Sequence, residues 1–121
     1  MNVVGNKQGL DLVLRLIDAS ELRAKVLSAN IANQNTPGYQ RREVKFETLL
    51  QKAMSKGHSA ATSIEPEIAE DTESPSRPDG NNVTLELELN ALRENRILYE
   101  TYASILQGHF NLMRAAITEG R

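Results

Sequence analysis

The chain has 121 residues, of which 40% are hydrophobic, and it contains three Tyr, two Phe, no Trp and no Cys at a formal net charge of −2. This length suits one domain, and a core with so few aromatic rings has to be built from Leu, Ile, Val and Ala. The lack of Cys excludes disulfides, thiolate metal sites and a cysteine nucleophile. No run of apolar residues exceeds three, so no membrane-spanning segment is expected, and the first residues do not have the pattern of a cleaved secretory signal.

Charge divides the chain into three parts. Residues 1–60 carry nine basic and five acidic residues. Residues 61–90 carry one basic and eight acidic residues, and residues 91–121 carry four basic and three acidic residues. The acidic middle also holds three of the four prolines. This composition predicts a flexible acidic insert at 57–79, between an N-terminal unit at 1–56 and a C-terminal unit at 80–121.

The N-terminal unit should begin with an amphipathic helix of about 24 residues. Its apolar stripe follows alternating steps of three and four residues: Leu10, Val13, Ile17, Ser20, Ala24, Leu27 and Ile31. Charged residues lie largely off this stripe, so the helix requires a partner.

The stretch "NIANQNTPGY", residues 30–39, is expected to end that helix. Asn is a poor helix former that tolerates left-handed backbone, so Asn30, Asn33 and Asn35 should weaken the helix progressively. Pro37 and Gly38 fit the two central positions of a type II turn, which places Gly38 at positive φ.

A short basic segment follows the turn. "YQRREVKF" has extended character, with Val44 and Phe46 on one side, and an amphipathic helix should then run from Phe46 to near Gly57. Three basic residues beside one Tyr indicate nucleic-acid binding only weakly, and the acidic middle argues against it. No nucleic-acid partner is expected.

A second, longer helix is predicted after Thr84, which is a plausible N-cap. Its main seam again alternates four and three residues: Leu85, Leu89, Leu92, Arg96, Tyr99, Ala103, Leu106, Phe110, Met113 and Ile117. A seam sustained over more than four heptads is typical of a coiled coil. A second stripe contains Leu98, Tyr102, Ile105, Leu112 and Ala116.

These patterns predict an all-α fold in which the elongated N- and C-terminal helices pair as a coiled coil or helical bundle. Pairing along the main seam would leave Leu98, Tyr102, Ile105 and Leu112 without cover, and large apolar patches are rarely left in water. We therefore expect those side chains to contact other subunits. A small self-contained bundle remains the open alternative.

The segment "LSANIANQNTPGYQRREVKFETLL" closely resembles the signature of bacterial flagellar basal-body rod proteins. The residues that match it are Ala29, Asn30, Ile31, Ala32, Asn33, Thr36, Pro37, Gly38, Tyr39, Arg41 and Phe46. The short length and the tail "NNVTLELELNALRENRILYETYASIL" look most like the proximal rod members of that family. The resemblance covers roughly residues 1–56 and 80–121.

The resemblance implies a structural protein of the periplasmic rod that is needed for flagellum assembly and motility. It implies export by the flagellar type III apparatus without a cleaved signal peptide, and assembly with copies of itself, other rod proteins, the inner-membrane ring and rod-base adaptor proteins. A soluble helical adaptor or export chaperone of the same secretion system is the alternative function.

An enzyme is not expected. His58 and His109 stand on different segments, and the sequence has no metal-binding His pair, no Gly-rich phosphate loop and no nucleophile motif. We predict no catalytic, cofactor or metal site and no small-molecule substrate.

Overall fold

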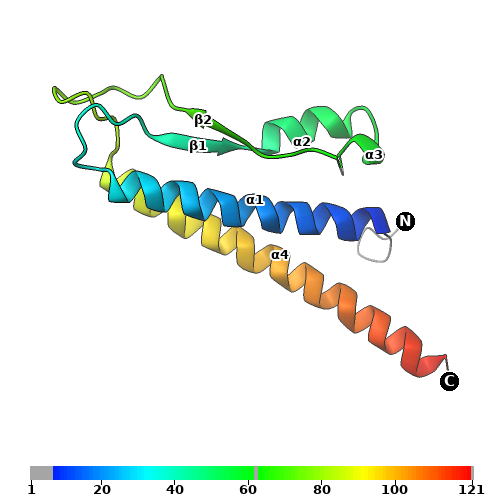
Figure 1. Cartoon of the computed structure of the whole chain (residues 1–121). Coiled ribbons are helices and arrows are strands. Elements are labelled where there is room, and N and C mark those ends of the chain that lie inside the picture. Colours follow the sequence, from blue (N-terminus) through cyan, green and yellow to red (C-terminus); the bar gives the residue numbers. More distant parts are fainter. Residues whose placement is uncertain (1–6, 62, 121) are drawn as a thin grey trace.

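The computed structural model describes residues 7–61 and 63–120. Two long helices, α1 (Lys7–Ala32) and α4 (Leu85–Glu119), run antiparallel, and a small unit lies along α1 on the side away from α4 (Figure 1). That unit contains β1 (Arg42–Lys45), α2 (Glu47–Met54), α3 (His58–Ala61) and β2 (Glu67–Glu70). The described chain is therefore mostly helical, as predicted, with a small sheet that the all-α prediction omitted.

The two long helices meet along lines of residues spaced by seven. Glu88, Asn95 and His109 are the buried residues of α4, and Val13 and Leu27 are buried on α1. A hydrogen bond of 2.8 Å from Asn95 Nδ2 to the carbonyl oxygen of Ser20 ties the two lines together. The line of α4 that faces α1 is thus largely polar, because α1 offers backbone and side-chain partners to it.

Part of the predicted seam of α4 therefore does not face α1. Leu85, Leu92, Ala103 and Leu106 are half-buried. Four large side chains of the seam are exposed by 39 to 49%, namely Leu89, Tyr99, Phe110 and Met113, and Ile117 is exposed by 64%. The prediction followed apolar spacing alone, which could not show that a polar line between the two apolar stripes would find partners on α1.

The two helices also differ in length. With 26 and 35 residues, α1 and α4 extend about 39 and 52 Å at 1.5 Å per residue. His109 lies beside Leu10, near the first described residues of α1. Residues 110–119, named here the α4 overhang, are exposed throughout and continue past the beginning of α1 (Figure 1).

The acidic middle of the chain pairs with the basic segment. β2 is antiparallel to β1, in a register that sets Glu70 opposite Arg42 and Glu67 opposite Lys45. Opposite charges on facing strand positions stabilise such a pair. Part of the segment predicted as a flexible insert at 57–79 thus forms a strand that pairs with β1, which the prediction did not include.

The basic segment itself forms as predicted. Val44 and Phe46 are exposed by 7% and 1%, so both point from one side of the extended segment into the core against α1. The helix predicted after Phe46 is α2, which ends at Met54.

Candidate assembly site

The turn that follows α1 has the predicted geometry. Gly38 has φ of 76°, and the Tyr39 amide donates to the carbonyl oxygen of Thr36 over 3.2 Å, which closes a type II turn. A hydrogen bond of 2.8 Å from the Gly38 amide to the carbonyl oxygen of Asp79 fastens the turn to the loop before α4. The chain reversal is thus held from both sides.

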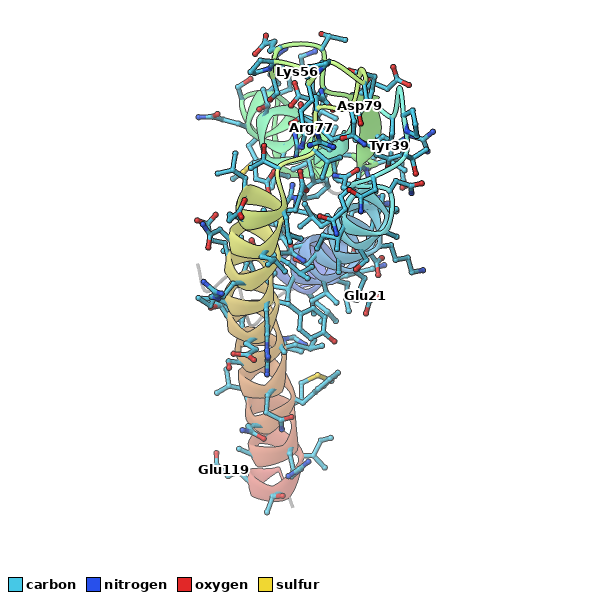
Figure 2. All side chains as sticks on the ribbon, turned by 90° about the vertical axis from the view of Figure 1, so that its left-hand side faces the viewer. Glu21, Tyr39, Lys56, Arg77, Asp79 and Glu119 are labelled. Atoms are coloured by element: carbon cyan, nitrogen blue, oxygen red, sulfur yellow. The ribbon has the colours of Figure 1, made fainter. Side chains whose placement is uncertain are left out.

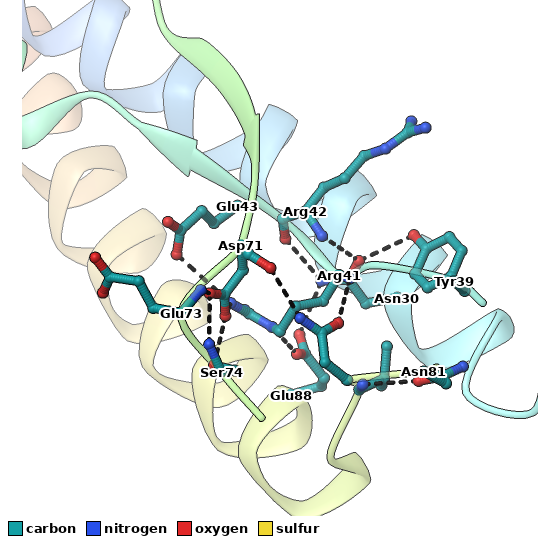
Figure 3. A network of polar contacts seen from close by, with 12 residues as sticks. Asn30, Tyr39, Arg41, Arg42, Glu43, Asp71, Glu73, Ser74, Asn81 and Glu88 are labelled. Carbon is teal, nitrogen blue, oxygen red and sulfur yellow. Dashed lines mark hydrogen bonds and ion pairs between the residues drawn. The ribbon is translucent and has the colours of Figure 1, made fainter. Parts of the chain in front are cut away.

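Asn30 is the centre of the contacts around this turn (Figure 3). Its side chain is fully buried, and Nδ2 donates to the carbonyl oxygen of Arg42 over 2.8 Å and to Glu88 Oε2 over 3.0 Å. Its Oδ1 accepts from the Arg42 amide over 2.9 Å and from the Tyr39 hydroxyl over 3.0 Å. An amide has two donor hydrogens and two acceptor lone pairs, so every one is used.

The helix continues two residues past Asn30, to Ala32. The side-chain amide of Asn30 pairs with the backbone of Arg42 at the start of β1 rather than with the backbone of its own helix, and a weakening effect of Asn30 on α1 stays a prediction. Asn33 shows the expected competition for backbone groups, because its side chain donates to the carbonyl oxygen of Ala29 over 2.8 Å.

Arg41 crosses from the turn to α4 and neutralises two buried carboxylates. Its Nε lies 2.5 Å from Glu88 Oε1, and its Nη1 lies 2.9 Å from Asp71 Oδ2, with Glu43 at 3.5 Å. The side chains of Glu88 and Asp71 are only 1% and 9% exposed. Removing one partner would leave a buried charge unpaired, which is costly.

These contacts keep Arg41 and Asp71 charged at neutral pH. Burial alone lowers the pKa of Arg41, but its hydrogen bonds to Glu88 and Asp71 outweigh burial and raise that pKa above its ordinary value. A hydrogen bond from the Ser74 hydroxyl lowers the pKa of Asp71 most, and hydrogen bonds from the Ser74 amide and Arg41 lower it further. Together they outweigh burial and hold this pKa well below its usual range.

Two asparagines before α4 complete the cluster. Asn82 accepts from the Arg41 amide over 2.6 Å and donates to the carbonyl oxygen of Asp71 over 2.8 Å. Asn81 donates to the carbonyl oxygens of Asn33 and Thr36, each over 2.9 Å. We call the set Asn30, Arg41, Asp71, Asn82 and Glu88 the clasp, because it joins the end of α1, the turn, the loop after β2 and the start of α4.

The sequence analysis missed three members of the clasp. Asp71 and Asn82 lie in segments whose composition is typical of solvated loops, and nothing in their spacing indicates a partner. Glu88 gave one signal, since it is a charged residue within the apolar repeat "LELEL". A charge in such a repeat is usually solvated, so the signal becomes clear only when its buried partner is known.

The structure divides the predicted assembly motif into two sets. Asn30, Tyr39 and Arg41 gather around the turn, Phe46 is buried at the other end of β1, and Ile31 and Asn33 are partly buried. The remaining motif residues are exposed: Ala29, Ala32, Thr36, Pro37 and Gly38. The motif therefore combines an internal framework with an exposed turn.

The residues predicted to contact other subunits lie beside the helix pair. Leu98, Ile105 and Leu112 are exposed by 39%, 37% and 52%, whereas Tyr102 is half-buried. On α1, Leu10 and Val13 line a small enclosed space together with Leu106 of α4. Ile17 and Ile31 are half-buried, and Leu27 is buried.

Within residues 7–61 and 63–120, no three His, Asp or Glu side chains are grouped so that they could hold a metal ion. None of the helices in these ranges is both long and apolar enough to cross a membrane. The polar groups of the clasp are occupied with one another, which is typical of a structural cluster.

Comparison with known proteins gives the family. Residues 19–40 match the family model described as "Flagella basal body rod protein". The flagellar basal body rod protein FlgB of Escherichia coli (strain K12) is 34% identical over 92% of this chain and 96% of the relative. The protein of the same name from Yersinia ruckeri is 33% identical over 81% and 85%, and that from Bacillus subtilis is 28% identical over 87% and 89%. Because the similarity extends over nearly the whole chain and includes the turn that the clasp holds, this chain belongs to the family of flagellar basal body rod proteins, which are structural proteins and not enzymes.

Proposed function

We propose that this chain is a proximal rod subunit that polymerises helically and joins the inner-membrane ring to the rest of the rod. The observation that carries the proposal is the state of α4. This helix extends past α1, and large apolar side chains are exposed on the sides that α1 does not cover: Leu87, Leu89, Ile97, Leu98, Tyr99, Ile105, Phe110, Leu112, Met113 and Ile117.

In the described part of this chain, α1 covers only one side of α4, and the beginning of α1 lies near His109. Exposed apolar surface of this extent marks protein interfaces. Neighbouring subunits that cover the other sides of α4 would supply the missing packing.

The exposed stripes favour an open assembly. Leu98, Ile105 and Leu112 repeat at intervals of seven along one flank of the helix pair, and Tyr99 and Phe110 lie on the other. Contacts between different surfaces are heterologous, and they generate a filament when the rotation between subunits does not close. A rod requires such a filament.

The clasp would make every subunit present the same shape to its neighbours. It fixes the β1–β2 strand pair and the exposed turn at 36–38 relative to both helices, through contacts between residues 30 to 58 positions apart. The proposed partners of this surface are copies of the chain, other rod proteins, the inner-membrane ring and rod-base adaptor proteins.

The proposal includes export by the flagellar type III apparatus without a cleaved signal peptide, and a final location in the periplasmic rod. The likeness to rod proteins supports both points. Flagellum assembly and motility would then depend on the chain.

Isolation of hook-basal bodies tests the proposal. We expect mass spectrometry and immunoblots to find the chain in purified basal bodies at its unprocessed length, and we expect cells without it to be non-motile. A chain confined to the cytosol of flagellated cells would contradict the proposal and favour an adaptor or export chaperone.

A further inference from the structure

A groove of about 520 Å³ lies between α1 and α4 on the flank of the helix pair that carries Tyr99. Its floor and walls include Ala24 of α1 and Leu89, Leu92 and Tyr99 of α4. Leu89 and Tyr99 are 42% and 39% exposed. The groove is thus an apolar surface that the described chain leaves uncovered.

One polar atom at this groove lacks a partner. Asn95 lines the groove and is only 4% exposed, yet its Oδ1 accepts no hydrogen bond from the described residues. A buried acceptor without a donor costs free energy, and a hydrogen-bond donor placed over Asn95 in the groove would reduce that cost. Its occupant should therefore combine an apolar face with a hydrogen-bond donor.

We propose that the occupant is the α4 overhang of a second copy of this chain. This inference rests on the proposed function and names the partner of one of its interfaces. The overhang carries Phe110, Met113 and Ile117 on one face, and these side chains are exposed by 46%, 49% and 64%. Arg114 stands four residues after Phe110 and three before Ile117, so it lies at the edge of the same face and supplies donors.

The dimensions of the two surfaces agree. The overhang has ten residues and is about 15 Å long, and the wall of the groove from Leu89 to Tyr99 is also about 15 Å long. An overhang helix could therefore lie along the whole groove.

One charge on the groove is complementary to one on the overhang. Glu21 borders the groove on α1, and Arg93 and Arg96 border it on α4. On the overhang, Arg114 stands at the edge of the apolar face and can pair with Glu21, whereas Glu119 lies about 150° around the helix from that face. Figure 2 shows Glu119 at the far end of α4, well away from Glu21, so the overhang meets this groove only on another copy. Overhang and groove are different surfaces, and their contact is the heterologous kind that a filament uses.

Cysteine cross-linking tests the contact, because the natural chain has no Cys to interfere. The full-length double variant Ala24→Cys/Met113→Cys places one thiol in the groove and one on the inserted face. Mild oxidation should yield a ladder of dimers, trimers and larger species on non-reducing gels, because each copy offers both surfaces.

The matched control is Ala24→Cys/Leu112→Cys. Leu112 precedes Met113 and lies about 100° around the helix from it, away from the inserted face. We expect the ladder to be lost. Equal ladders from the two variants would overturn the inference.

Charge reversal provides a second readout. Arg114→Glu in the Ala24→Cys/Met113→Cys background should reduce the ladder, and a further Glu21→Arg should restore it. If Glu21→Arg does not restore the ladder, Glu21 is not the partner of Arg114, and the proposed contact is contradicted.

Cross-linking in isolated basal bodies separates this inference from the proposed function. If the chain is present there but Ala24→Cys joins a different protein, or joins nothing, the proposed occupant is wrong and the rod function stands. If the purified chain forms the ladder but is absent from basal bodies, the contact stands and the rod function is wrong.

Discussion

Single residues in this protein connect segments that are distant along the chain. Asn30 and Arg41 together contact the turn, β1, the loop after β2 and α4. Each contact satisfies a polar group that burial would otherwise penalise. Substitutions in the clasp should therefore affect stability more than their exposed neighbours do.

Asn30→Ala should lower the free energy of unfolding by about 2–4 kcal/mol, because it leaves buried groups of Arg42, Tyr39 and Glu88 without partners. Urea unfolding followed by circular dichroism measures the loss. Asn35→Ala is the control, since Asn35 is exposed, and its effect should be about 0.5 kcal/mol or less. Similar losses for both variants would contradict the role given to Asn30.

Gly38→Ala and Gly108→Ala should have opposite effects. Neither added Cβ meets another atom within 4 Å, so backbone conformation alone decides the sign. Gly38 has φ of 76°, so Gly38→Ala should lower the free energy of unfolding by on the order of 1 kcal/mol. Gly108 lies within α4, so Gly108→Ala should raise the free energy of unfolding by about 0.5–1 kcal/mol. Thermal melts of the two variants would reveal the signs. A stabilising Gly38→Ala would show that the turn is not strained by a side chain.

Asp71 should make stability depend on acid. Its pKa is depressed in the folded chain, so its contribution is fully present above its ordinary value near 3.8 and is lost as the pH falls through the folded pKa. We expect Asp71→Asn to be less stable at pH 7 and to show a weaker pH dependence of unfolding below about pH 4. Denaturant titrations between pH 2 and pH 7 measure this. If the free energy of unfolding of the variant depends on pH as steeply as that of the unmodified chain, other carboxylates cause the acid sensitivity.

At the scale of elements, α4 has different roles along its length and around its axis. Its first two thirds pack a partly polar line against α1, and its last ten residues have no cover among the described residues. The two apolar stripes flank that line. Position on the helix should therefore decide whether a substitution affects the monomer or the assembly.

Leu106→Asp and Leu112→Asp distinguish these roles. Leu106 is half-buried beside Leu10 and Val13, so a charge there should destabilise the monomer by about 2–4 kcal/mol. Leu112 is 52% exposed, and its variant should melt within a few degrees of the unmodified chain. Both variants should fail to enter rods in cells. Equal destabilisation of the monomer would instead favour a self-contained bundle.

At the scale of the whole molecule, the chain is an elongated unit that is stable at one end and uncovered at the other. The clasp lies near the end of α1 and the start of α4, beside the β1–β2 strand pair, and the overhang lies at the opposite end of the molecule (Figure 1). Local stability follows buried contacts and should decline along α4 in the same direction.

Hydrogen exchange should show this gradient in the dilute chain. Amides of residues 110–119 should exchange nearly as fast as in an unstructured peptide, and those between Glu88 and Leu106 should exchange more slowly. Assembly should then protect the overhang. Uniform slow exchange along α4 in a verified monomer would contradict the need for neighbouring subunits.

Local features of this protein could be predicted from its sequence because they depend on neighbours in the chain. The helical period of apolar residues predicted α1 and α4. Pro37 followed by Gly38 predicted the turn, and the alternation of residues predicted that Val44 and Phe46 lie on one side. The signature around the turn indicated the family. Only the tertiary structure decided which line of α4 faces α1, which partner Glu88 has and that the acidic middle pairs with β1. Glu88 meets Arg41 and Asn30 across 47 and 58 residues, and burial of such a charge is favourable only when the folded chain brings its partners to it.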